Sequence, residues 1–272
     1  MPADTLEIHG LTVHVEGSGP TLLLLHGWPD SAALWDATVA ALRDGYRCVR
    51  FTLPGFDVDL PPRSMSVHQL TDLIAAVVDQ VSPDQPVTLL LHDWGCLFGA
   101  AYARRYPERV ARAVVTDVGD AGSPAHLHGL TLRQKALIGG YQLPLALLWL
   151  LGRRAPRPAT ALTRRIAGWL GCPTPAGRIG WQQNYPYAVQ VLGSLGGRRG
   201  MARLDTVFDS VPVLFCYGRR KPFSFHSAHW LDVLEARRGC GVRGFDTGHW
   251  IMVDQPEAYH DAVRTWLDGV PA

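Results

Sequence analysis

The chain has 272 residues, of which 47% are hydrophobic and 18% are charged, so it can bury one large α/β core that carries an insertion. Its formal net charge of +2 gives no overall sign of a nucleic-acid partner. The five cysteines show no paired spacing, so we predict neither a disulfide framework nor a metal site, no other cofactor, and a reduced, cytoplasmic setting.

The chain opens with a pattern typical of a half-buried hairpin. The stretch "LEIHGLTVHVEGSG" (residues 6–19) alternates apolar and polar residues and then turns at Gly17 and Gly19. The run "TLLLLHG" (residues 21–27) is typical of a strand that is buried on both faces. The first 30 residues lack the basic start and apolar stretch of a secretory signal, and no run approaches the roughly 20 apolar positions of a membrane span.

Strands and helices then alternate. The sequence predicts helix 31–42, strand 46–55, helix 66–81, strand 87–93, helix 95–106 and strand 111–119. The same rhythm returns late in the chain, with strand 211–218, helix 227–237, strand 241–249 and helix 256–267. Such alternation predicts a mostly parallel sheet with helices on both faces.

Between these two parts the pattern changes. Residues 121–205 contain "YQLPLALLWLLG", several tryptophans and tyrosines and many helix breakers, but no strand-like alternation. We therefore predict a helical cap at 121–205, inserted into a core that is formed by residues 1–120 and 206–272.

The run "LLLHDWGC" (residues 89–96) ends a buried strand with an aspartate, directly before a helix. A strand, a sharp turn and a helix form an elbow that lifts a nucleophile above the carboxyl edge of a sheet, and Asp93 occupies the nucleophile position. Gly95 is small, as the close approach of strand and helix requires, whereas Leu91 is bulky for such a turn. The alternative interpretation is that Asp93 simply caps the helix.

Two further motifs stand in complementary places. "HGWPDS" (residues 26–31) begins with His26 and follows the third strand. A turn there presents a backbone N–H which, with the N–H of the residue after the nucleophile, stabilises an oxyanion, so Trp28 and Trp94 are the expected donors. "DTGHWIMVDQPEAY" (residues 246–259) places His249 between the last strand and the last helix.

With "HGWP", "HDWG" and "GHWIMVDQPE", the chain resembles the α/β-hydrolase family along its whole length, and within it the branch of epoxide hydrolases and haloalkane dehalogenases. The resemblance implies an α/β-hydrolase fold: a mostly parallel eight-stranded sheet flanked by helices, with an inserted helical cap. It also implies that Asp93 attacks carbon to form a covalent alkyl-enzyme ester, and that His249 deprotonates the water that hydrolyses this ester. Aspartate in place of serine argues against an ordinary esterase.

The third member of the catalytic triad departs from the family pattern. Its usual place follows "VPVLFCYG", where this chain has "GRRKPF" with Lys221. One subset of haloalkane dehalogenases carries the acid after the preceding strand instead, and Asp117 in "ARAVVTDVGD" stands there. Asp117 is therefore the candidate acid that orients His249, and Asp120 and Asp246 are weaker candidates.

The resemblance leaves two chemistries open. Trp94 suits the halide site of a dehalogenase, but Trp28, in a slot where many dehalogenases have asparagine, resembles epoxide hydrolases. That family uses cap tyrosines to protonate the epoxide oxygen, and Tyr185, Tyr187 and Tyr141 are the candidates, with Tyr185 first. We expect an epoxide hydrolase, with a haloalkane dehalogenase as the alternative. Lys221 keeps a third possibility open, a binding protein or a catalyst of ring opening without hydrolysis.

The cap is strongly basic. Residues 121–204 contain eleven Lys or Arg and no Asp or Glu. The expected partner is a small hydrophobic substrate, and this charge favours an anionic one or a position near anionic lipid. A compositional preference for arginine is the alternative explanation, because 24 of the 26 basic residues are arginine. The apolar cap surface could cover the active site or join two copies in a homodimer.

Overall fold

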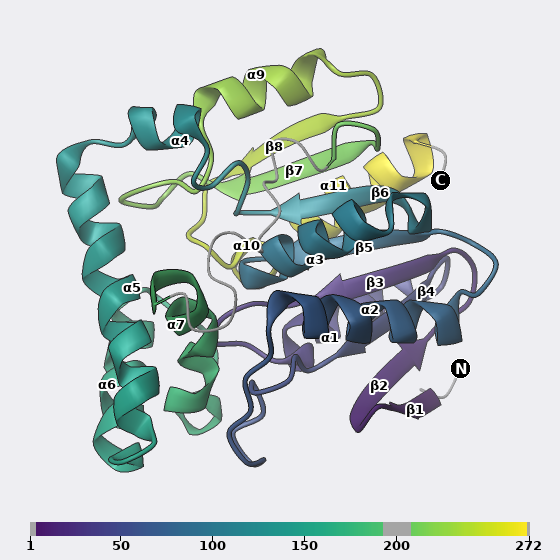
Figure 1. Ribbon diagram of the computed structural model, residues 1–272. Helices are drawn as coiled ribbons and strands as arrows, with labels where there is room; N and C mark the ends of the chain where they lie inside the picture. Colours follow the sequence, from purple (N-terminus) through teal and green to yellow (C-terminus); the bar gives the residue numbers. More distant parts are fainter. Residues whose placement is uncertain (1–3, 193–207, 271–272) are drawn as a thin grey trace.

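The computed structural model describes residues 4–192 and 208–270, and its centre is one eight-stranded sheet (Figure 1). The strands lie in the order β1-β2-β4-β3-β5-β6-β7-β8. The first two pairs, β1 with β2 and β2 with β4, are antiparallel, and all later pairs are parallel. The strands are β1 (Asp4–Ile8), β2 (Leu11–Glu16), β3 (Thr21–Leu25), β4 (Arg47–Phe51), β5 (Val87–His92), β6 (Val110–Thr116), β7 (Val213–Gly218) and β8 (Gly241–Phe245).

Helices cover both faces of this sheet because its central strands are apolar on both sides. In β3, Leu23 and Leu25 pack into the cluster that contains α2 and α3, whereas Leu22 and Leu24 pack into the cluster that contains α1 and α11. The core helices are α1 (Asp36–Leu42), α2 (Val67–Val81), α3 (Trp94–Arg105), α9 (Ala228–Ala236), α10 (Ile251–Asp254) and α11 (Pro256–Gly269). The predicted strands and long core helices are thus confirmed, and the structure adds that Ser66 caps the start of α2.

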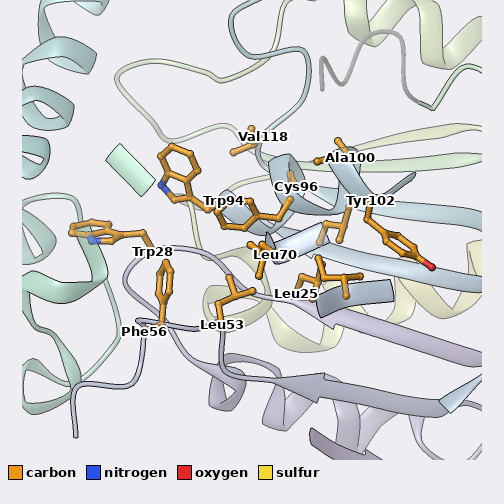
Figure 2. Packing of buried hydrophobic residues seen from close by; sticks show 14 of the residues in the cluster. Leu25, Trp28, Leu53, Phe56, Leu70, Trp94, Cys96, Ala100, Tyr102 and Val118 are labelled. Atoms are coloured by element: carbon orange, nitrogen blue, oxygen red, sulfur yellow. The ribbon is translucent and has the colours of Figure 1, made fainter. Parts of the chain in front are cut away.

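The larger hydrophobic cluster runs from the interior of the core toward the cap. Figure 2 shows Tyr102 at one end of it and the indoles of Trp28 and Trp94 at the other, beside the helices of the cap. The carboxyl ends of β3 and β5 therefore meet the cap through aromatic side chains.

The described part of the chain between β6 and β7 contains helices and turns but no strand. Its α-helices are α4 (Pro124–Gly129), α5 (Leu132–Gly152), α6 (Pro156–Trp169) and α7 (Tyr185–Leu192), and short 3-10 turns lie at Ala176–Arg178 and Trp181–Asn184. Helix α5 packs against α6 and α7, and Figure 1 places α5 and α6 side by side at the edge of the molecule, away from the sheet. The end of the predicted cap, residues 193–205, lies outside the described residues.

Helix α5 corrects one expectation from the sequence. With 21 residues and a mean hydropathy of 1.2, it is long and apolar enough to cross a membrane by length and composition alone. The sequence prediction that no segment reaches this threshold is therefore wrong. One third of this stretch is buried inside the protein, because one side of α5 packs against α6 and α7.

Candidate active site

Asp93 lies on a strained elbow between β5 and α3. Its backbone has φ 52° and ψ −122°, a left-handed conformation that is uncommon for a residue with a side chain. The side chain makes no capping hydrogen bond to α3. Its Oδ1 instead accepts the backbone N–H of Trp28 at 2.7 Å. The alternative interpretation of Asp93 as an ordinary helix cap is therefore wrong.

Two glycines of α3 make room for this elbow. A Cβ on Gly95 would lie 2.2 Å from the carbonyl oxygen of Leu25, so only glycine lets α3 start so close to β3. A Cβ on Gly99 would lie 2.6 Å from the Leu91 side chain. The bulky Leu91 is thus accommodated because the facing position one turn into α3 is a glycine.

The loop after β3 holds the other side of Asp93. A Cβ on Gly27 would lie 2.3 Å from Asp93 Oδ1 and 2.5 Å from the backbone nitrogen of Trp94. The Trp28 N–H, which donates to Asp93 Oδ1, and the backbone nitrogen of Trp94 therefore both lie close to the Gly27 backbone. This is the arrangement expected of an oxyanion-stabilising loop.

His249 lies between two carboxylates. Its Nε2 is 3.3 Å from Asp93 Oδ2, and its Nδ1 donates a short hydrogen bond to Asp117 Oδ2. Asp117 follows β6, is fully buried, and adopts a positive φ of 68° that turns its side chain toward the β7–β8 edge. The structure thus brings Asp93, His249 and Asp117 together in the order that a nucleophile, base and orienting acid require.

Lys221 contacts the same acid. Its ammonium group forms a short ion pair with Asp117 Oδ1, which also accepts the backbone N–H of Gly218 at 2.9 Å. Lys221 stands where the resemblance leads us to expect the triad acid. Its side chain binds Asp117, the candidate acid that follows the preceding strand. Asp120 and Asp246 do not reach His249: Asp120 binds Ser123 and Ser227, and Asp246 pairs with Arg220 at the surface.

These charges shift one another's protonation. Burial favours the neutral form of Asp117, but the charges of Lys221 and His249 outweigh it and lower the pKa of Asp117 to about 2. Burial likewise acts to lower the pKa of His249, yet the charge of Asp117 and hydrogen bonds to both carboxylates raise it to about 9. For Asp93, burial is again outweighed, chiefly by His249, and its pKa is lowered. At neutral pH the resting site therefore holds the ionised carboxylates of Asp93 and Asp117 on either side of a His249 imidazolium.

A pocket above Asp93 and His249 is lined mainly by aromatic side chains from the core and the cap. Arg220 and Lys221 also line it. Its aromatic lining consists of Trp28, Tyr141, Trp169, Tyr187, Phe223, Phe225 and Trp250.

Of the three candidate tyrosines, Tyr141 and Tyr187 line this pocket and Tyr185 does not. The rings of Tyr141 and Tyr187 lie edge to face, 6.0 Å apart. Tyr185 packs instead against Phe56 and Trp149. The choice of Tyr185 as the first candidate is therefore wrong in geometry, because residues two apart on α7 point to opposite sides of the helix.

Burial raises the pKa of Tyr141 and of Tyr187, and the charge of Asp93 adds to the shift in both. Both phenols therefore stay protonated near a carboxylate that is ionised.

His26 and Trp94 do not line the pocket. His26 is buried, its Nδ1 donates to the Gly27 carbonyl at 2.9 Å, and its Nε2 accepts the Leu53 N–H at 2.9 Å. Burial lowers the pKa of His26 to about 4, so it stays neutral and braces the loop instead of contacting a substrate. The Trp94 indole packs edge to face against Tyr187 at 5.1 Å and supports the pocket wall from behind.

Sequence reasoning missed the residues that brace the site. His92 donates its Nε2–H to the backbone carbonyl of His249 at 3.1 Å. Asp30 accepts the Trp250 indole N–H at 2.9 Å and also binds Thr174 of the cap. Both residues stood inside quoted motifs, but nothing in their local spacing indicated partners about 150 or more residues away.

Comparisons with known proteins agree with the fold. Residues 20–144 match the family described as alpha/beta hydrolase fold. "Epoxide hydrolase 2" of Siraitia grosvenorii is 35% identical over 116 residues, which is 40% of this chain and 36% of that protein. "Probable oxidoreductase EphD" of Mycobacterium tuberculosis is 38% identical over 100 residues, 35% of this chain and 17% of that protein. The chain thus matches well under two thirds of the length of these relatives.

The whole fold is shared with an epoxide hydrolase from Bacillus megaterium. That structure superposes with a TM-score of 0.70 over 97% of this chain and all of that one, at 19% identity. Sequence and structure together show that this chain has the α/β-hydrolase fold, and the chain is similar to proteins named as epoxide hydrolases and haloalkane dehalogenases.

Proposed function

We propose that this protein opens an epoxide through a covalent ester on Asp93 and hydrolyses that ester to a diol with water activated by His249. The observation that carries the proposal is the pair of cap phenols, Tyr141 and Tyr187, which line the same pocket as Asp93 and whose pKa values burial raises, so that both stay protonated. An opening epoxide needs an acid opposite the nucleophile, and two neutral phenols supply it.

In the first step Asp93 Oδ2 attacks an epoxide carbon. The C–O bond of the ring breaks, and the leaving oxygen takes a proton from Tyr141 or Tyr187. The other carboxylate oxygen, Oδ1, stays bound to the Trp28 N–H and becomes the ester carbonyl. The product is a hydroxyalkyl ester of Asp93 and a phenolate, which regains its proton from solvent.

In the second step His249 takes a proton from water, and the resulting hydroxide attacks the ester carbonyl carbon. Negative charge then develops on Oδ1, next to the Trp28 N–H. Collapse of this intermediate breaks the bond between the carbonyl carbon and the alkyl oxygen, which takes the proton from His249 and leaves as the diol. Esterification removes the charge of Asp93, one of the groups that raise the pKa of His249. The imidazolium of the resting state therefore loses its proton more readily when a base is needed.

The alternative, haloalkane dehalogenation, has less support. The indole N–H of Trp28 is bound to Asn184 at 2.9 Å, and that of Trp250 is bound to Asp30, so neither is free for a halide. Among cap tryptophans, Trp169 lines the pocket but is 62% exposed, and a halide site needs shielded donors.

We expect Tyr141→Phe and Tyr187→Phe each to lower kcat for an aryl epoxide such as styrene oxide, and the double variant to lower it by about a hundredfold or more. Each substitution removes one of the two acids that can protonate the leaving oxygen. Steady-state diol formation measures the effect, and halide release from 1-bromohexane is followed in parallel.

Tyr185→Phe is the matched control. Its hydroxyl is buried and has no hydrogen-bond partner among the described residues, so its removal should leave kcat unchanged. Turnover of bromohexane but not of epoxides by the wild type, or full epoxide activity of the double variant, would refute the proposed function.

A further inference from the structure

Helix α5 presents an exposed apolar stripe on the side opposite the pocket. Its buried side carries Tyr141, Leu145, Leu148 and Gly152, which are spaced three or four residues apart. The exposed side carries four leucines that are between 43% and 50% exposed, namely Leu143, Leu147, Leu150 and Leu151. We call these four leucines the α5 stripe.

The stripe continues toward the start of α5 without a polar side chain. Ala136, Gly139 and Gly140 are also exposed, and a Cβ on either glycine would meet no atom within 4 Å. No charged residue stands between Lys135 and Arg153, a length of about 25 Å along a helix. Monomeric soluble proteins rarely expose a contiguous apolar surface of this length to solvent.

Basic side chains frame the stripe at both ends. Arg133 and Lys135 are exposed at the start of α5, and Arg153, Arg154 and Arg157 are exposed around the turn into α6. All 24 acidic residues of the chain lie outside residues 121–204, so a general preference for arginine does not explain the charge of the cap. In the described cap, Arg178 is the one basic residue whose side chain forms an ion pair, with Asp59.

We propose that the α5 stripe and its flanking arginines bind the surface of an anionic lipid membrane, with α5 lying in the interface. Leucines that enter the acyl boundary and arginines that meet anionic headgroups are the chemistry of such helices. A second copy of the chain fits less well, because two facing stripes would bring identical positive charges together without acidic partners.

A membrane-spanning role for α5 conflicts with its packing. Tyr141 belongs to the pocket wall, and Leu145 and Leu148 pack into the core of the cap. Withdrawal of the helix into a bilayer would dismantle the pocket. A surface position buries the stripe and leaves the other side of α5 as it stands.

Co-sedimentation with vesicles tests the proposal without reference to activity. The wild-type protein should pellet with vesicles of phosphatidylcholine and phosphatidylglycerol, stay in solution with phosphatidylcholine alone, and be released by salt. Leu147→Glu/Leu150→Glu and Arg154→Glu/Arg157→Glu should each lower the apparent affinity about tenfold or more.

The matched controls lie outside the cap. Leu60 lies before the cap in the sequence and is 59% exposed, and Arg104 is exposed at the end of α3. The variants Leu60→Glu and Arg104→Glu should therefore bind vesicles as the wild type does. Wild-type protein that stays in solution with both vesicle types would overturn the proposal. So would controls that lose binding equally, or a dimer in light scattering that Leu147→Glu/Leu150→Glu dissociates.

Discussion

Replacing Asp93 by Asn should lower kcat for the epoxide by at least about ten-thousandfold, because no group of comparable nucleophilicity remains to attack carbon. The amide oxygen can still accept the Trp28 N–H, so the elbow and its positive φ are kept. Steady-state diol formation measures the loss, and circular dichroism and thermal unfolding establish that the variant is folded.

The matched control for this substitution is Asp72→Asn. Asp72 is 57% exposed on α2 and pairs with Arg105 at the surface, so the same chemical change there should leave kcat unaltered. Epoxide turnover that survives in Asp93→Asn within tenfold of the wild type would mean that water attacks the substrate directly, and the ester mechanism would have to be abandoned.

Asp117→Asn should lower kcat by about ten-thousandfold. Asparagine in this place can no longer hold the imidazolium, and its amide can favour the wrong tautomer of His249. The loss should fall on ester hydrolysis more than on ester formation, so intact mass during turnover should show the ester accumulating on the variant. Asp246→Asn, an exposed carboxylate near the same edge, is the control.

Stability should respond to pH in the same variant. The folded pKa of His249 is raised from 6.5 to about 9, so its charged contacts stabilise the wild type fully below pH 6.5 and are lost as pH rises through about 9. Without the charge of Asp117, the largest of the groups that raise this pKa, that decline should shrink. Thermal unfolding of both proteins from pH 6 to pH 9.5 measures it, and parallel curves would contradict the assignment of Asp117.

Much of the fold follows from local pattern. The runs around Leu23 and Leu90 are apolar on both faces, so burial in a parallel sheet was predictable from them alone. The helical character of the described stretch between β6 and β7 was predictable because breakers and aromatic residues replace strand alternation there. Asp93 and His249 became candidates because Asp93 follows β5 directly and His249 stands in the loop after β8, and the carboxyl ends of parallel strands meet at one edge.

What escaped prediction depends on side-chain direction and on contacts between distant parts of the chain. The sequence cannot show which face of α7 turns to the pocket, so Tyr185 and Tyr187 could not be told apart. The pairing of Lys221 with Asp117 joins two loops about 100 residues apart. The apolar length of helix α5 was underestimated because glycines and a proline interrupt its apolar run, and the helix accommodates them.

The most direct test of the account is the intact mass of His249→Gln after incubation with styrene oxide. Without the base, ester formation can proceed but ester hydrolysis cannot, so the protein should gain the mass of one whole epoxide, and peptide mapping should place it on Asp93. An unchanged mass, while the same preparation still binds the epoxide, would contradict a covalent ester on Asp93.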